Sequence, residues 1–208
     1  MSKVGGFDFI APYYDRLAHL AFGNAIKDSQ LIYLDRIPKA SRILVIGGGT
    51  GIFLYALHQH APDAHVVYVD ASARMLEIAK KNTPPGLRVD FVHGRLEDMP
   101  RGQAFDVVVT YFFLDMFSTV DLQNLISNIA EVVAPDSMWL VADFVKRKWW
   151  HGLLLACMYA FFSAFAGLRV RSLADWNAQL ARAGFRRAES RCFFSGFIES
   201  AIFKDEIK

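Results

Sequence analysis

Residues 42–51 read Arg-Ile-Leu-Val-Ile-Gly-Gly-Gly-Thr-Gly, an apolar run that leads directly into a glycine-rich turn. This order is typical of a buried strand followed by a tight turn and a helix. A turn without side chains lets backbone N–H groups approach a ligand that any Cβ would obstruct, and a helix N-terminus attracts polar groups. The stretch therefore predicts a ligand site at the carboxyl end of the first strand of an α/β domain.

A second apolar run, residues 65–70, ends at Asp70. An acidic residue at the end of the second strand is well placed to accept hydrogen bonds from both hydroxyls of a ribose. Because the carboxyl ends of neighbouring parallel strands meet at one edge of the sheet, Asp70 should lie beside the glycine turn. The two features together predict a ligand that contains a nucleoside.

The spacing of the glycines narrows the choice of ligand. A dinucleotide fingerprint has the form G-x-G-x-x-G, and the position that its last glycine would take is Ile52 here. A phosphate-binding P-loop ends in Gly-Lys-Ser/Thr, which does not follow the turn in this chain. The pattern of Gly47, Gly49 and Gly51 therefore favours a nucleoside without a pyrophosphate.

The rest of the chain alternates strand and helix patterns. We expect strands at 42–46, 65–70, 88–92, 105–110 and 137–143, and helices at 51–60, 73–82 and 121–134, with Pro135-Asp136 in the connection before the fifth strand. This alternation favours a parallel sheet with helices on both faces. The first forty residues follow a helical pattern, and the chain ends with helices at about 149–166 and 173–184 and strands at 186–194 and 197–203.

The composition excludes several classes of protein. Hydrophobic residues make up 53% of the 208 residues and the formal net charge is +2, so the chain can bury a large core and has no basic field suited to nucleic acid. Cys157 and Cys192 form no CxxC pair and the histidines show no metal-ligand spacing. We therefore expect free thiols, no metal site and, because the N-terminus lacks a secretory pattern, a cytoplasmic protein.

The glycine turn and Asp70 resemble those of the class I S-adenosylmethionine-dependent methyltransferases, as do the Ala71-Ser72-x-x-Met75-Leu76 run and the segment Gly94–Pro100. The resemblance implies S-adenosylmethionine as methyl donor, S-adenosylhomocysteine as product, and a turn that holds the methionine part. It places donor contacts at Gly47, Gly48, Gly49, Thr50, Gly51, Asp70, Ala71, Ser72, Met75, Arg95, Leu96, Glu97, Tyr111 and Phe112.

The same resemblance implies a doubly wound, Rossmann-like α/β fold. Its seven-stranded sheet is expected to be mostly parallel and to close with an antiparallel C-terminal hairpin around Ser195-Gly196. We expect a single domain over residues 1–208, made of an N-terminal helical cap (1–40), a donor-binding core (41–145), a helical insertion after the fifth strand (146–185) and the closing hairpin (186–208).

The opening Phe7-Asp8-Phe9-Ile10-Ala11-Pro12-Tyr13-Tyr14-Asp15 resembles that of the quinone C-methyltransferase branch (methyltransferase types 11 and 25). In that branch the opening folds over the donor, which makes Tyr14 a further donor contact. The alternative is that Tyr14 only packs its helix onto the sheet.

Two positions depart from the family pattern. Val45 stands where many relatives carry an acid, and Arg95 stands where a carboxylate usually accepts from the adenine amino group. These departures keep open a catalytically silent, donor-binding scaffold. A nicotinamide-dependent reductase is a further alternative, although the last glycine of its fingerprint and a Tyr-x-x-x-Lys pair are missing.

The stretch from Trp149 to Leu168 contains no Asp, Glu, Lys or Arg and is long enough to cross a bilayer. The strands expected after it must rejoin the same sheet, which favours a helical insertion instead. So many apolar residues predict either a helix covered on all sides or the wall of an apolar pocket. Cations at 146–148 suit an anionic headgroup, so we also expect peripheral membrane contact through 146–171. The alternative is a lid that only seals the fold.

These features predict methyl transfer to a small hydrophobic or aromatic acceptor: a phenol, quinol, enol or carboxylate. Such an acceptor loses a proton before or during the attack, so a base is useful. The ionisable candidates are Asp115, Asp143 and His151, with an N-cap role as the alternative for Asp115. The pattern leaves open whether oxygen, carbon or nitrogen is methylated, and it leaves the oligomeric state open.

Overall fold

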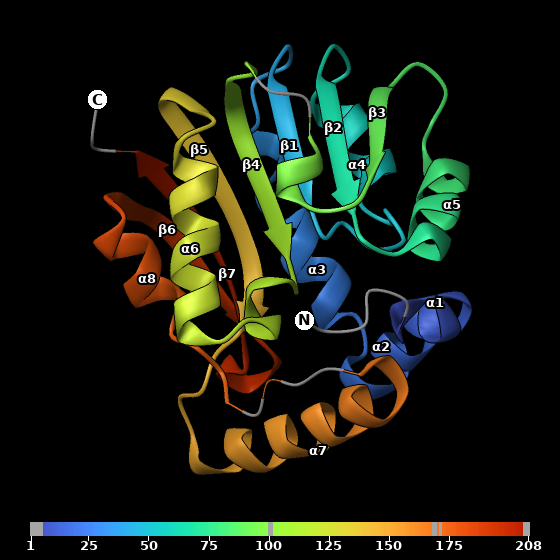
Figure 1. Ribbon diagram of the computed structural model, residues 1–208, viewed down its shortest axis with the longest axis vertical. Coiled ribbons are helices and arrows are strands. Elements are labelled where there is room, and N and C mark those ends of the chain that lie inside the picture. Colours follow the sequence, from blue (N-terminus) through green and yellow to red (C-terminus); the bar gives the residue numbers. More distant parts are fainter. Residues whose placement is uncertain (1–5, 100–101, 168–169, 171, 206–208) are drawn as a thin grey trace.

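The predicted strands assemble into one seven-stranded sheet in the order β3-β2-β1-β4-β5-β7-β6 (Figure 1). The computed structural model describes residues 6–99, 102–167, 170 and 172–205. The first five strands are parallel to their neighbours, while β7 runs antiparallel to β5 and β6. The strands are β1 (Arg42–Ile46), β2 (His65–Asp70), β3 (Arg88–His93), β4 (Phe105–Tyr111), β5 (Val133–Phe144), β6 (Phe185–Phe193) and β7 (Ile198–Asp205).

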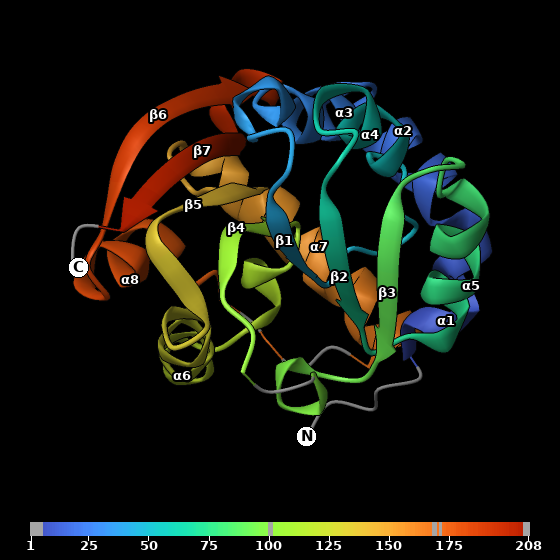
Figure 2. The same ribbon diagram turned by 90° about the horizontal axis from the view of Figure 1, so that it is seen from above.

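Helices cover both faces of this sheet, as a parallel sheet requires. Figure 2 shows α3 and α4 on one side and α6 and α8 on the other, and a buried apolar cluster lies on each face. The α-helices are α1 (Gly6–Ile10), α2 (Tyr14–Phe22), α3 (Ala25–Leu31), α4 (Leu54–His60), α5 (Ala73–Asn82), α6 (Thr119–Ala130), α7 (Trp149–Ala166) and α8 (Trp176–Arg182); single 3-10 turns are η1 (Ala11–Tyr13), η2 (Leu34–Arg36), η3 (Leu96–Asp98), η4 (Leu114–Met116) and η5 (Phe194–Gly196). The expected doubly wound fold with a closing hairpin is confirmed.

The expected break at Pro135-Asp136 is wrong, because β5 already begins at Val133. Its pairing with β4 shifts register between Phe105 and Val107, and Asp136 has a φ of 61°. An irregularity of this kind accommodates a proline, which has no N–H to give to the ladder. The helices α4 and α8 are also shorter than expected, and the Asp175 side chain caps α8 by accepting a hydrogen bond from the Ala178 N–H at 3.0 Å.

The insertion after β5 forms the helix expected at 149–166. Figure 1 shows α7 beyond the carboxyl ends of the parallel strands, beside α1 and α2. His151, Leu155 and Tyr159 are buried on its inner side, whereas Trp149 and Leu153 are exposed. The helix is therefore covered on one side only. Within the described ranges, no helix has the length and apolar character needed to cross a membrane.

Candidate functional site

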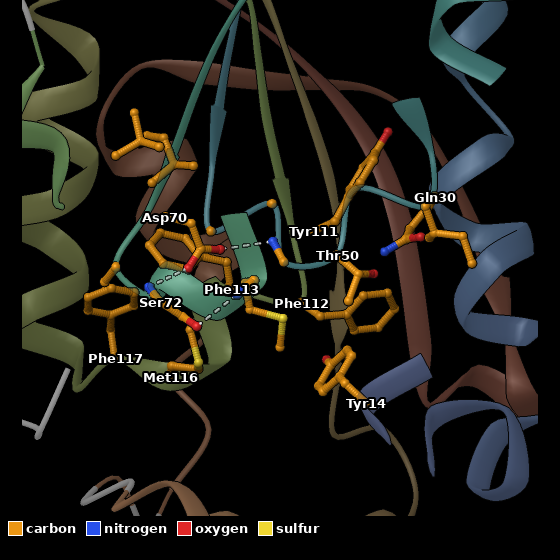
Figure 3. A pocket seen from close by; sticks show the side chains of 18 of the residues that line it. Tyr14, Gln30, Thr50, Asp70, Ser72, Tyr111, Phe112, Phe113, Met116 and Phe117 are labelled. Carbon is orange, nitrogen blue, oxygen red and sulfur yellow. Dashed lines mark hydrogen bonds between the residues drawn. The ribbon is translucent and has the colours of Figure 1, made fainter. Parts of the chain in front are cut away.

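A cavity of about 720 Å³ lies at the carboxyl ends of β1, β2 and β4. Its walls come from the glycine turn, the end of β2, the loop after β4, the helices α2 and α3, and part of α6. Figure 3 shows Asp70 and Ser72 together on one side of it, and Gln30 and Thr50 on the other. The sequence-predicted residues that line it are Tyr14, Gly47, Gly48, Gly49, Thr50, Asp70, Ala71, Ser72, Met75, Arg95, Leu96, Glu97, Tyr111 and Phe112.

The glycine turn is crowded from both sides. Gly47 has a φ of 63°, and a Cβ at this position would lie 2.1 Å from the Phe113 ring. A Cβ at Gly48 would lie 2.2 Å from the Tyr68 ring, whose hydroxyl donates to the Gly49 carbonyl at 3.0 Å. Backbone alone therefore fits this part of the wall, and its polar groups can approach a ligand closely.

Gly51 has a different role from the one expected. It is not among the residues that line the cavity, and a Cβ there would lie 2.8 Å from Leu54 and 3.1 Å from Ala79. The missing side chain thus lets α4 approach α5. The glycine-rich motif does not reveal whether Gly51 contacts a ligand or allows close packing, because both roles require a glycine at this position of the turn.

Asp70 is held by two backbone hydrogen bonds. One carboxylate oxygen accepts from the Gly49 N–H and the other from the Ser72 N–H, each at 2.9 Å. Burial raises the pKa of Asp70, while these two bonds lower it. Each oxygen retains acceptor capacity, so the carboxylate is fixed in the cavity wall and able to receive two hydroxyl groups.

The N-terminal helices are tied to the two turns that form the cavity wall. The Asp8 carboxylate accepts from the Ser72 hydroxyl and from the Arg74 N–H, and the Asp15 carboxylate accepts from the Thr50 hydroxyl at 2.9 Å. These bonds place Tyr14 at the cavity wall. Burial and nearby carboxyl groups, Asp115 first among them, raise the pKa of the Tyr14 hydroxyl, which therefore stays protonated.

Asp143 is fully buried and holds the loop after β4 in place. One of its oxygens accepts from the N–H groups of Phe113, Leu114 and Asp115 at 3.2, 2.8 and 3.3 Å, and the other accepts from its neighbour Phe144 at 2.7 Å. Asp143 is not among the cavity-lining residues. Its position at the end of β5 suggested a base, but its hydrogen bonds are those of a carboxylate that organises the backbone.

His151 and Asp115 also lie outside the cavity lining. The fully buried His151 ring accepts from the Arg147 N–H at 3.1 Å and fixes the chain before α7. Asp115 is 6% exposed, and its buried Oδ1 has no hydrogen-bond partner among the described residues. The structure therefore does not bring the three candidate bases together around a ligand.

The two buried carboxyl groups share an unfavourable environment. Burial and the Asp143 charge raise the pKa of Asp115 well above its usual range, and burial raises the pKa of Asp143 to about 7. Asp143 accepts hydrogen bonds from four backbone N–H groups, whereas Asp115 Oδ1 accepts none among the described residues. When the pair holds one proton, that proton therefore resides on Asp115. A protonated carboxyl cannot act as a base.

We expect Asp115→Asn to stabilise the fold at neutral pH relative to the unmodified chain. Between about pH 4 and the raised pKa values, the folded chain keeps a proton that the unfolded chain releases, so stability falls as pH rises, by up to about 1.4 kcal/mol per pH unit for one proton. An asparagine at position 115 does not titrate, so the variant does not show this loss of stability with rising pH. Urea unfolding at pH 5 and pH 8 measures it, and a stability difference that does not grow with pH would contradict the assignment.

Several cavity residues were missed in the sequence. Phe113, Met116 and Phe117 line it from the loop after β4, Lys27 and Gln30 line it from α3, and α6 contributes polar side chains such as Asn124 and Asn128. The Oε1 of Gln30 is buried and without a partner among the described residues. No motif marks these positions, because each becomes part of the site only when its helix packs against the sheet edge.

The expectation that the insertion forms a pocket wall is wrong for α7. None of the cavity-lining residues belongs to that helix, and from the described part of the insertion only Val170 reaches the lining. Pro100, Leu168, Arg169 and Arg171 belong to predicted segments but lie outside the described residues. Val45 is 1% exposed inside an apolar cluster, which explains why an acid at that position would be costly in this chain.

The strand order, the glycine turn and the acid at the end of β2 together are typical of α/β domains that bind a nucleoside at the carboxyl ends of their strands. Residues 43–136 match a family model described as a methyltransferase domain. The chain also matches a magnesium-protoporphyrin O-methyltransferase of Rhodobacter capsulatus, with 32% identity over 131 residues, 59% of this chain and 57% of the relative. A ubiquinone/menaquinone biosynthesis C-methyltransferase of Campylobacter jejuni is 27% identical over 162 residues, 73% of this chain and 66% of the relative.

Solved structures give the same fold. A mitomycin 7-O-methyltransferase superposes with a TM-score of 0.67 at 20% identity, over 88% of this chain and 54% of that one. Residues 43–136 thus match the methyltransferase domain that the resemblance of the motifs predicted, and the fold of most of the chain is that of solved methyltransferases. The chain spans less than two thirds of the length of either curated relative.

Proposed function

We propose that this chain binds S-adenosylmethionine in the cavity and transfers its methyl group to a small hydrophobic or aromatic acceptor, such as a phenol, quinol, enol or carboxylate. The observation that carries the proposal is one cavity whose wall combines the side-chain-free turn, the fixed Asp70 carboxylate and a set of aromatic rings. The two curated relatives support it, since their names describe methyl transfer to a porphyrin and in quinone biosynthesis.

The residues present fit the donor. The turn at Gly47 and Gly48 has room for backbone contact only, which suits the methionine part, and Asp70 can accept from both ribose hydroxyls. Met75 and Leu96 supply buried apolar surface for the adenine ring. The bound donor supplies an electrophilic methyl group on a positively charged sulfur.

The acceptor end is assigned to the part of the cavity under α2 and α3. Tyr14, Tyr111 and Phe112, which the family resemblance implied as donor contacts, supply aromatic surface there. The buried Oε1 of Gln30 has no partner among the described residues and can accept a hydrogen bond from an acceptor hydroxyl. A flat apolar molecule matches rings of this kind.

The chain's own residues then align the acceptor, exclude water and hold the loop after β4 through Asp143. The candidate bases Asp115, Asp143 and His151 lie outside the cavity lining. A phenol, enol or carboxylic acid therefore loses its proton to bulk water before it binds, and the residues of the cavity align the resulting anion with the methyl group.

Labelled methyl transfer to a panel of phenols, quinols and fatty acids tests the proposal. Within one acceptor series, each added buried methylene should raise kcat/KM by roughly fourfold, the equivalent of about 0.8 kcal/mol, until the cavity is full. Heat-treated protein is the control. A preference for small polar acceptors would contradict an apolar acceptor end.

A catalytically silent donor-binding scaffold is the second candidate, and Arg95 favours it because it lines the cavity where relatives carry an acid. The two candidates differ in one result. Donor binding without methyl transfer to any member of the panel favours the scaffold, whereas transfer to one acceptor excludes it.

A further inference from the structure

The outer face of α7 has no covering in the described structure. We use this name for the exposed residues on the side of the helix that points away from the sheet: Trp149, Leu153, Ala156, Cys157, Ala160 and Ala164. Trp149 is 86% exposed and Leu153 is 67% exposed, while Phe165 at the end of the helix is 50% exposed. A row of exposed apolar residues along one helix is typical of a surface that binds something.

The charges that flank α7 along the sequence are of one sign. Residues 144–174 contain no Asp or Glu, and Lys146, Arg147 and Lys148 directly precede the helix. The Arg147 guanidinium pairs with the buried Glu199 at 2.9 Å, which anchors the basic turn to the sheet, while Lys146 and Lys148 are exposed. Cations beside an apolar helix face match an anionic lipid surface.

The neighbouring helices add apolar groups at the same end of the molecule. Helix α1 contacts α7, and Figure 1 shows α1 and α2 next to it. Phe9 is 71% exposed, Tyr13 58% and Leu20 85%. Aromatic side chains of this kind prefer the boundary between lipid and water.

We propose that the outer face of α7 docks the protein on anionic membranes, with the helix lying in the plane of the lipid surface. A second copy of the chain fits this face less well. The segment 144–174 contains no Asp or Glu that could pair with Lys146 and Lys148 of a second copy packed on the same face.

Docking in this orientation would place the site next to the lipid. The inner side of α7 faces the loop after β4, where the Tyr159 hydroxyl lies 3.4 Å from the Asp115 carbonyl. A membrane-dissolved acceptor could then reach the cavity without crossing water. This consequence rests on the proposed function, whereas the docking itself does not.

Cosedimentation with vesicles tests the proposal. Phosphatidylcholine vesicles containing about a third phosphatidylglycerol should bind the protein at least tenfold better than pure phosphatidylcholine, and salt should weaken the binding. Trp149→Glu/Leu153→Glu should lower the partition coefficient at least tenfold. The matched control is Tyr55→Glu/Val120→Glu. Tyr55 lies on α4 and is 62% exposed, and Val120 lies in the first turn of α6 and is 65% exposed. This variant should leave vesicle binding unchanged.

Thermal unfolding of both double variants verifies that they fold. Absence of vesicle binding by the folded, unmodified chain, or equal loss in the control variant, would overturn the proposal. A concentration-dependent dimer that only the Trp149→Glu/Leu153→Glu variant loses would assign the face to a second copy instead. Calorimetry with S-adenosylhomocysteine is run on the same samples, so a failure of the lipid proposal is distinguishable from a failure of donor binding.

Discussion

Replacing Asp70 by alanine is expected to weaken the binding of S-adenosylmethionine and S-adenosylhomocysteine by at least about 100-fold. The carboxylate would accept from two ribose hydroxyls, and hydrogen bonds to a charged group contribute about 1.5–3 kcal/mol each, so the loss of both exceeds the roughly 2.7 kcal/mol that 100-fold represents. The variant also frees the N–H groups of Gly49 and Ser72, which now donate to the carboxylate at 2.9 Å. Calorimetric titration measures the change.

Asp90→Ala is the matched control for this prediction. Asp90 lies on the neighbouring strand β3, is 65% exposed and pairs with His65 at the surface. Its loss should leave both dissociation constants unchanged. Equal affinities for Asp70→Ala and the unmodified chain, with both proteins folded, would remove Asp70 from the site.

The second large effect is expected for Gly47→Ala, which should reduce donor binding at least tenfold, a change of about 1.4 kcal/mol or more. Gly47 has a φ of 63°, and the new Cβ would lie 2.1 Å from the Phe113 ring. Either the ring or the turn must move, and both form the cavity wall. The titration with S-adenosylhomocysteine reports the loss, and thermal unfolding reports the cost to the fold.

Gly102→Ala separates crowding from backbone strain. Gly102 also has a positive φ, 79°, but its added Cβ would have no neighbour within 4 Å. Both variants therefore share a strain of about 1–2 kcal/mol from a left-handed alanine, and only Gly47→Ala disturbs the cavity. If the two variants bind equally well, crowding of the turn is not what excludes a side chain there.

The regular parts of the fold could be predicted because each has a local cause. The Val-rich run of residues 65–70 became β2 with the predicted bounds. Ser72 caps α5 by accepting a hydrogen bond from the Met75 N–H, so that helix begins where the sequence indicates. The glycine turn and Asp70 are local motifs as well, and the sheet edge brings them together in the expected way.

The roles that the sequence did not predict depend on contacts between segments that are distant in the chain. Asp143 lies at the carboxyl end of its strand just as Asp70 does. It nevertheless binds backbone N–H groups of the loop after β4, and nothing in the sequence distinguishes these two roles. Gln30 and Asn128 reach the cavity only because their helices pack beside it. The apolar composition of α7 predicted either a helix covered on all sides or a pocket wall, with a sealing lid as the alternative. In the structure the inner face of that helix packs on the core and its outer face is exposed.

Donor binding is tested by calorimetric titration of the unmodified chain with S-adenosylmethionine and S-adenosylhomocysteine. We predict one site for both ligands with a micromolar dissociation constant, equivalent to about −8 kcal/mol. A folded chain that binds neither ligand would contradict this prediction, because the turn and Asp70 would then have no nucleoside to hold.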